Sequence, residues 1–518
     1  MIFNSPDFVF AVLPLAFTGY FLLMRWRVTE LAKGWLVLAS LVFYGWWNPF
    51  YLPLLAGSIW FNYRVGIALM AAAGQPAGKR LLWLGVTANL ALLGWFKYAD
   101  FAASNIDALT GATIALPGVL LPLGISFFTF QQIMFLVDIF RAGVGRAGVG
   151  RAGMDREGAG PVGAEPASRP AVSALSYAAF VCFFPHLIAG PIVRPADILP
   201  QLEASRLARP VAANLAAGLT IFLLGLGKKL VLADTFGSFA DTGFAAASHG
   251  TVLTLIEAWY AVLAYALQIY FDFSGYSDMA IGLARMANVR FPLNFDSPYK
   301  ARDIADFWRR WHISLSRFLR DYLYIPLGGN RQGEVRRGVN LMLTMLLGGL
   351  WHGAAWTFIA WGGLHGLYLI VHRLWAGMGG RLGLRLPGPL AQALTLLAVV
   401  VAWVPFRADG VAATIGMLRG MAGLNGFALP RMIVGAWPAL AEIARPVPVL
   451  LSLGDAHTLS LPEVSACLLL GWLIVLTLPH VHELSERARG WALTAGLAFT
   501  AQALFFAPYA APFLYFRF

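Results

Sequence analysis

Leu390–Val404 reads LAQALTLLAVVVAWV and contains no charged residue. A helix needs about 20 apolar residues to cross the core of a bilayer, and this run approaches that length. Three further runs of the same kind lie at Phe8–Met24, Leu81–Phe96 and Val464–Leu478. The sequence therefore predicts a chain that crosses a membrane several times, with Phe8–Met24 as a retained first span rather than a cleaved signal.

The composition of the whole chain supports this class. Hydrophobic residues make up 59% of the 518 residues and charged residues 12%, whereas a soluble protein carries about 25% charged residues. The two cysteines, Cys182 and Cys467, both lie in apolar surroundings. They are too few for a disulfide framework or a thiolate metal site, so we interpret them as small buried hydrophobes and expect no metal.

The net charge of +12 is unevenly distributed. Arg290–Arg337 contains ten basic residues against five acidic ones. Apolar spans on both sides disfavour a nucleic-acid surface, and cytoplasmic loops collect Lys and Arg. The basic loops at Arg25–Lys33 and Lys79–Arg80 alternate with the uncharged loop at Asn48–Tyr51, which predicts an N-terminus outside.

Three segments depart from simple spans. Ser173–Ile192 is apolar, interrupted by two prolines and a glycine and flanked by arginines, which predicts a re-entrant or interfacial segment. Residues 141–172 begin with the repeat RAGVGRAGVGRAGM and predict a mobile cytoplasmic loop. Asn340–His372 would be about 50 Å long as one helix, against a bilayer core of about 30 Å. We therefore expect two helices there, joined at Trp361–Gly363.

Lys228 and Lys229 fit a span poorly. They fall near the outer end of an apolar run at Val211–Leu232, where they must snorkel, pair or line a cavity. Together, these segments predict an all-α integral membrane protein with about twelve crossings. We expect a single polytopic domain over residues 1–518.

Residues 300–325 follow the spacing of an amphipathic helix. Its apolar face comprises Ile304, Phe307, Trp308, Trp311, Leu315, Phe318, Leu319 and Tyr322. The opposite surface carries Arg309, Arg310, Arg317 and Arg320. This pattern predicts an interfacial helix with aromatics among acyl chains and arginines at lipid phosphates or at a nucleotide-like donor. His312 lies at the edge of the stripe, and by itself such a histidine is more often an ordinary interfacial residue than a catalyst.

His352 lies deeper. It follows Arg337 by fifteen residues, or about 22 Å along a helix. An intramembrane ionisable residue is costly and therefore a functional hypothesis by default. Trp351 and several small residues surround it in sequence, and a neutral imidazole suits removal of a proton from a hydroxyl. A histidine bonded to a neighbouring helix for packing is the alternative, and spacing alone favours neither.

Other polar groups are weaker candidates. Asp272, Ser274, Tyr276 and Asp278 crowd the end of an apolar run at Val252–Phe271, as a polar site or as helix caps. His365 and His372 could share a helix face, but no carboxylate cluster joins them as a metal site usually requires. His480 and His482 lie at the end of an apolar run beside Glu483, where solvated positions are common. The sequence also contains no phosphate-binding Gly-Lys-Ser/Thr loop, no serine nucleophile elbow and no His-Glu-x-x-His zinc motif.

Five blocks resemble the membrane-bound O-acyltransferase superfamily, in particular its bacterial alginate O-acetyltransferase branch. They are PLGISFFTFQQ at Pro122–Gln132, FFPHLIAGPIVR at Phe183–Arg194, YFDFSGYSDMAIGLARM at Tyr270–Met286, FPLNFDSPYKARDIADFWRRWHISLSRFLRDYLYIPLGGNR at Phe291–Arg331 and GGLWHGAAWTFIAWGGLHG at Gly348–Gly366. The resemblance covers nearly the whole chain. It departs at 141–169, where this chain is longer, and after Val411, where the match is loose.

The resemblance implies helices around a central catalytic tunnel in a bacterial inner-membrane protein. It implies that His352 is catalytic and that His312 is a second functional residue near the cytoplasmic mouth. The residues expected to bind donor or substrate are Arg309, Arg310, Trp311, Asp272, Ser274, Tyr276, Asp278 and Trp351.

The implied reaction moves an acetyl group from a cytoplasmic thioester, acetyl-coenzyme A, to an exopolysaccharide hydroxyl. No tightly bound cofactor is expected. The expected partners are membrane lipids, the acyl donor and periplasmic acetyl-transfer proteins, without nucleic acid. Alginate is the leading acceptor, followed by cellulose, peptidoglycan and D-alanyl transfer to teichoic acid. A glycan or lipid transporter and a non-catalytic subunit of a secretion complex are the alternatives.

Overall fold

The computed structural model describes residues 2–111, 114, 118–154, 172–203, 210–382, 386–442, 445–447, 461–483 and 513–514. The chain forms two compact units. The first comprises Met1–Leu219 and Ala280–Pro292, and the second comprises Thr220–Met279 and Leu293–Phe518. Two long helices, α9 (Ala212–Gly227) and α11 (Leu255–Met286), contain residues of both units.

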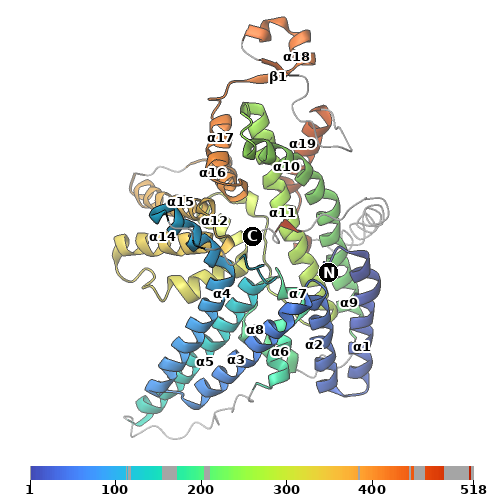
Figure 1. The fold of residues 1–518 in the computed structure, drawn as a ribbon, viewed down its shortest axis with the longest axis vertical. Helices are drawn as coiled ribbons and strands as arrows, with labels where there is room; N and C mark the ends of the chain where they lie inside the picture. Colours follow the sequence, from blue (N-terminus) through green and yellow to red (C-terminus); the bar gives the residue numbers. More distant parts are fainter. Residues whose placement is uncertain are drawn as a thin grey trace. The chain divides into compact units, whose positions relative to one another are not determined.

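The first unit is built from packed helices. Its elements are η1 (Phe8–Val12), α1 (Leu13–Arg25), α2 (Thr29–Gly45), η2 (Pro49–Tyr51), α3 (Leu52–Ala71), α4 (Pro76–Thr110), α5 (Ile125–Met154), α6 (Ala174–Cys182), α7 (Phe184–Leu187) and α8 (Pro195–Glu203). Helices α3, α4 and α5 lie side by side, and α1 packs on α2 (Figure 1). Gly85 allows close packing of α4 on α5, since a Cβ there would lie 2.5 Å from Leu136.

The segment predicted to be re-entrant is interrupted in the structure. Helix α6 ends at Cys182, α7 spans one turn, and residues 188–194 are not helical. Gly124, with φ of +73°, packs against this bend, because a Cβ there would lie 2.6 Å from the carbonyl oxygen of Leu187. Of the predicted mobile loop at 141–172, α5 covers the part up to Met154 and residues 155–171 lie outside the described residues. Its mobility stays a prediction.

The second unit contains the histidine motifs. Its elements besides α9 and α11 are η4 (Lys228–Ala233), α10 (Asp234–Ser248), η5 (Pro298–Lys300), α12 (Ile304–Arg310), α13 (Ile313–Phe318), η6 (Leu319–Tyr324), α14 (Gly333–His352), α15 (Trp356–Leu382), α16 (Gly388–Arg407), α17 (Val411–Met421), β1 (Ala428–Pro430), α18 (Arg431–Ala436), η7 (Pro438–Glu442), β2 (Arg445–Val447), α19 (Leu461–Thr477) and η8 (Val481–Glu483). The described residues are thus almost entirely helical, and β1 pairs with β2 in parallel with Ala428 opposite Arg445.

Five helical stretches are long and apolar enough to cross a membrane, among the residues that the structure describes. They are Phe8–Arg25, Pro49–Ala71, Ile125–Gly143, Ala212–Ser248 and Gly388–Arg407. The last of these contains the run at Leu390–Val404, and the first contains the predicted first span. About twelve crossings and a central tunnel stay predictions.

Three predicted element boundaries were wrong. The segment 300–325 is not one helix, because α12 ends at Arg310 and α13 begins at Ile313. Four of its aromatic residues, Phe307, Trp308, Trp311 and Phe318, are also buried within the protein. The break in 340–372 falls at Gly353–Ala355, not at Trp361–Gly363. Finally, α11 continues to Met286, so the polar residues 272–278 lie within a helix and do not cap its end.

Candidate active site

A cavity in the second unit brings several predicted site residues together. It is lined by Ile269, Asp272, Phe273, Trp311, His352, Trp361, Trp403, Phe406 and Leu514. Three of these nine, Asp272, Trp311 and His352, were predicted from sequence. The remaining lining is aromatic or aliphatic. The cavity therefore places an imidazole and a carboxylate in an apolar enclosure, where electrostatic interactions are strong.

His352 is the last residue of α14, and its side chain is 6% exposed. The rings of Trp351, Trp361 and Phe406 surround the imidazole at centroid distances of 4.9, 5.1 and 5.2 Å. The chain turns immediately afterwards at Gly353, where a Cβ would overlap the ring of Phe358. A glycine is therefore required directly after the histidine, where the chain turns against Phe358.

His312 lies between α12 and α13 in a left-handed backbone conformation, with φ of +42°. Its side chain is completely buried, and burial lowers its pKa to about 3, so the imidazole is neutral. Its ring lies edge-on to Phe273, a lining residue, at 4.7 Å. Trp351 lies between the two histidines, 6.5 Å from His312 and 4.9 Å from His352.

One residue that sequence reasoning missed holds the His312 turn. The Oδ1 atom of Asn294 lies 3.1 Å from His312 Nδ1 and accepts hydrogen bonds from the hydroxyl and the backbone N–H of Ser314. The backbone carbonyl of Asn294 accepts a hydrogen bond from the N–H of Ile313 at 2.9 Å. The side-chain Nδ2 of Asn294 donates a hydrogen bond to the hydroxyl of Ser277 at 3.1 Å. No local periodicity signals this role, because Asn294 lies 18 residues before the histidine.

Asp272 belongs to a buried group of charges. Its carboxylate lies 2.9 Å from Lys229 Nζ and accepts a hydrogen bond from the backbone N–H of Leu514 at 3.1 Å. Lys229 also pairs with Asp234 at 2.6 Å. It lies in the π-helical turn η4, a distortion that is frequent at functional sites. Of the options that the sequence left for Lys229, the structure selects pairing.

The other polar residues of α11 have different neighbours. Asp278 lies 2.7 Å from Lys228 Nζ and 3.4 Å from His482 Nε2. The Tyr276 ring meets Phe513 edge-on at 5.0 Å, and Ser274 is completely buried. None of these three is among the residues that line the cavity. Their role in binding a donor stays a prediction.

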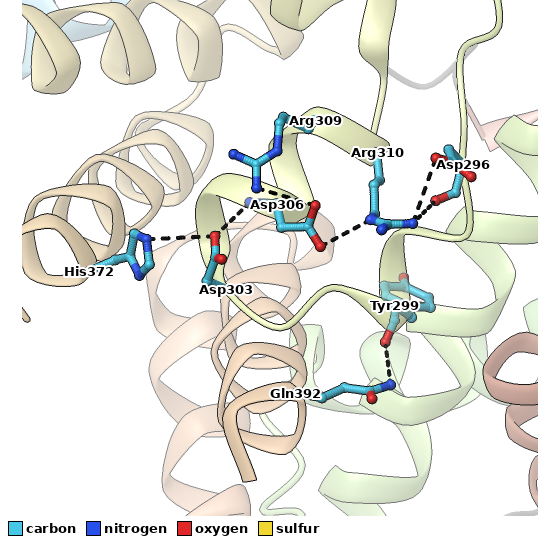
Figure 2. A network of polar contacts seen from close by, with 8 residues as sticks. All are labelled: Asp296, Tyr299, Asp303, Asp306, Arg309, Arg310, His372 and Gln392. Atoms are coloured by element: carbon cyan, nitrogen blue, oxygen red, sulfur yellow. Dashed lines mark hydrogen bonds and ion pairs between the residues drawn. The ribbon is translucent and has the colours of Figure 1, made fainter. Parts of the chain in front are cut away.

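Arg309 and Arg310 lie on a surface network (Figure 2). Both pair with Asp306, at 3.3 and 3.0 Å, and Arg310 also lies 3.6 Å from Asp296. The Arg309 side chain is 66% exposed. The structure thus places these arginines outside the cavity lining, in reach of charged groups in solvent or at a membrane surface. Contact with a donor stays a prediction.

Sequence reasoning also missed most of the apolar lining. Trp361 lies inside the motif that was singled out, and Trp403 and Phe406 lie at the end of α16. Trp361 stacks on Trp403 at 6.0 Å, and Trp403 contacts Trp311 at 4.9 Å. Aromatic residues are common in membrane helices, so only their convergence in three dimensions marks them as part of a site.

Comparison with known proteins identifies the family of the chain. The family model described as membrane-bound O-acyltransferase matches residues 73–404. A peptidoglycan O-acetyltransferase of Helicobacter pylori is 46% identical over 432 residues, covering 83% of this chain and 81% of the relative. A probable alginate O-acetylase of Pseudomonas aeruginosa is 41% identical over 427 residues, which cover 81% of this chain and 75% of the relative. A teichoic acid D-alanyltransferase of Streptococcus thermophilus is 31% identical over 208 residues, which cover 38% of this chain and 50% of the relative.

The family model and these relatives define the class as an acyltransferase of the membrane. The chain belongs to the membrane-bound O-acyltransferase family, in the branch that includes the alginate O-acetylases. The resemblance noted in the sequence is therefore confirmed.

Proposed function

We propose that this acyltransferase moves an acetyl group from acetyl-coenzyme A on the cytoplasmic side of a bacterial inner membrane to a polysaccharide hydroxyl outside. The observation that carries the proposal is the position of His352. It ends a helix at the wall of an enclosed aromatic cavity that also contains the carboxylate of Asp272. The names of the relatives support O-acetylation as the reaction.

In this proposal His352 is the general base. The imidazole takes the proton of an acceptor hydroxyl while the hydroxyl oxygen attacks the thioester carbonyl. The C–O bond of the ester forms, the C–S bond of the thioester breaks, and the proton passes from His352 to the leaving thiolate. Asp272 stabilises the transient imidazolium, because opposite charges attract strongly in an apolar enclosure. The aromatic lining keeps out water that would hydrolyse the thioester.

Alginate is the proposed acceptor. Several relatives in the same branch are named alginate O-acetylases, at about four-tenths identity over most of the chain. Peptidoglycan is the second candidate, because a relative with that name is 46% identical over 83% of this chain. Periplasmic acetyl-transfer proteins are proposed to receive the acetyl group and complete the transfer.

Chemical analysis of two polymers tests this proposal. Ester-linked acetate is measured in the exopolysaccharide and in the peptidoglycan of the strain that encodes the chain, before and after deletion of the gene. We expect deletion to remove acetate from the exopolysaccharide and leave peptidoglycan unchanged. Loss from peptidoglycan alone would replace alginate by the second candidate, and no loss from either polymer would overturn polysaccharide acetylation.

Complementation separates an enzyme from a transporter or a scaffold. The deletion strain receives the wild-type gene, His352→Ala or His249→Ala, a matched control at an exposed histidine outside the cavity lining. We expect wild type and His249→Ala to restore acetate and His352→Ala to fail at equal protein level. Restoration by His352→Ala would favour a non-catalytic subunit.

A further inference from the structure

The turn at His312 is strained and buried. A side chain with a Cβ seldom occupies the left-handed region, and such residues cluster at functional sites. His312 has φ of +42° and ψ of +55° and is completely buried. Glycine or asparagine would adopt this conformation at lower cost. A histidine in this conformation therefore indicates a functional role for its imidazole.

The amide of Asn294 can be oriented from its partners. The backbone N–H of Ser314 can only donate, and it points to one terminal atom of the amide at 3.3 Å. That atom must be the oxygen Oδ1. The Ser314 hydroxyl lies 2.8 Å from the same atom, and the opposite end of the amide donates to Ser277. The side chain of Asn294 is completely buried, so protein groups alone set this orientation.

The orientation of the amide fixes the tautomer of His312. Its Nδ1 lies 3.1 Å from Oδ1, an atom that only accepts, so Nδ1 carries the proton. A neutral imidazole has one N–H, and Nε2 is therefore the nitrogen with the free lone pair. This Nε2 is buried and has no hydrogen-bond partner among the described residues. A buried acceptor without a partner is costly unless a ligand satisfies it.

The ring of His312 is close to the cavity. It contacts Phe273, which lines the cavity, and it shares the neighbour Trp351 with His352. The turn itself does not require the imidazole, because the hydrogen bonds of Ile313 and Ser314 to Asn294 already join the two segments.

We propose that Asn294 is a positioning residue that holds His312 as the Nδ1–H tautomer, so that Nε2 accepts a hydrogen bond from an O–H or N–H group of a substrate. This inference rests on the proposed acyl transfer. A coenzyme A arm has amide N–H groups and a polysaccharide has hydroxyls, so both substrates carry the required chemistry. Neither sequence spacing nor the comparisons assign a role to Asn294.

Nitrogen NMR tests the tautomer without any assay of activity. The full chain is labelled with ¹⁵N-histidine in detergent micelles, and the His312 signals are assigned by their loss in His312→Gln. We expect a protonated Nδ1 and an unprotonated Nε2 in the wild type and in Ser277→Ala. The Ser277→Ala variant keeps the contacts of Asn294 Oδ1 with His312 and Ser314. We expect Asn294→Leu to remove this signature. A wild-type spectrum with protonated Nε2 would overturn the inference.

Kinetics test whether the tautomer matters to catalysis. Inside-out membrane vesicles are supplied with radiolabelled acetyl-coenzyme A. We expect Asn294→Leu to lower transfer about 100-fold or more at every pH. Asn294→Asp keeps an acceptor for Nδ1–H and Ser314, so it restores activity at high pH. Its added charge favours the imidazolium, so the acid limb of the profile moves up by about 1–3 pH units.

The variants separate the possible outcomes. A raised KM for acetyl-coenzyme A in Asn294→Leu would assign the hydrogen bond to the bound donor, and a lowered kcat with unchanged KM would assign it to the transition state of the transfer; both support the proposal. Asn294→Asp with an unshifted pH profile, or Asn294→Leu with wild-type kinetics, would overturn it. Wild-type vesicles that consume no acetyl-coenzyme A would overturn the proposed function, and the NMR spectrum would still decide the tautomer.

Discussion

At the scale of single residues, the chain shows how burial gives polar groups distinct roles. His352 was predicted from its depth in an apolar segment, and the structure places it in an enclosed cavity with Asp272. Arg309 and Arg310 were predicted to bind a donor, yet both pair with Asp306 in the preceding turn. That pairing was visible in the i, i+3 and i, i+4 spacing. The contacts of Asn294 with His312 and of Lys229 with Asp272 were not, because these partners lie far along the chain.

The buried pair of Lys228 and Asp278 gives a prediction about stability. The side chains are 14% and 3% exposed, and their charged atoms lie 2.7 Å apart. Removal of one partner leaves an uncompensated buried charge, so we expect Lys228→Met to lower the free energy of unfolding by about 3–5 kcal/mol. Adding Asp278→Leu recovers most of this loss. The measurement is thermal unfolding of purified protein in detergent.

An exposed pair provides the control for that experiment. Arg309→Ala breaks a surface contact to Asp306 and is expected to change stability by less than about 1 kcal/mol. If the double variant were as unstable as Lys228→Met alone, the pairing of Lys228 with Asp278 would not explain the loss.

At the scale of elements, sequence periodicity identified helices well and their interruptions poorly. The aromatic stripe of 304–322 continues across His312 without a change of period, so it predicted one helix where there are two. The break depends on hydrogen bonds that Asn294 accepts from His312 and Ser314, which no local pattern reveals. The length of 340–372 correctly predicted that the helix is interrupted. The prediction placed the interruption at the glycine pair Gly362–Gly363, which is the wrong position. Gly362 instead allows the close packing of α14 on α15.

Helices α14 and α15 give a prediction about that packing. A Cβ at Gly362 would overlap the carbonyl oxygen of Met345, whereas a Cβ at the neighbouring Gly363 would lie 3.5 Å from a side-chain carbon of Leu346. We expect Gly362→Ala to lower the free energy of unfolding by about 1–3 kcal/mol. It should also lower acetyl transfer, because α14 ends at His352 and a small displacement of a catalytic group costs rate.

The matched control is Gly363→Ala, for which we expect wild-type unfolding and activity. Thermal unfolding and vesicle transfer are measured on both variants. Equal behaviour of the two would contradict the close approach of α14 and α15 at Gly362.

At the scale of the whole molecule, composition and charge were sufficient to predict a helical membrane protein. The family model and the apolar helices agree with that prediction. The number of crossings stays a prediction, because five helical stretches among the described residues are long and apolar enough to cross a membrane. Among the described residues, α4 and α14 contain 35 and 20 residues but are not apolar enough to count as candidate spans.

Chemical labelling tests the predicted orientation. Single cysteines are introduced at Phe50, Arg80 and Arg336 in a Cys467→Ala background, in which the remaining Cys182 is buried. Phe50 is 87% exposed and follows α2, so we expect an impermeant maleimide to label it from outside. Arg80 and Arg336 lie in basic segments and should be labelled only after lysis. The reverse pattern would contradict the predicted orientation.

The central claim is that His352 catalyses acyl transfer in the aromatic cavity. Its most direct test is transfer of radiolabelled acetate from acetyl-coenzyme A to polysaccharide in inside-out vesicles at equal protein level. We expect His352→Ala to reduce transfer by about 10²–10⁴-fold, and the exposed control His249→Ala to match the wild type. Wild-type transfer by His352→Ala would contradict the assignment of His352 as the catalytic base.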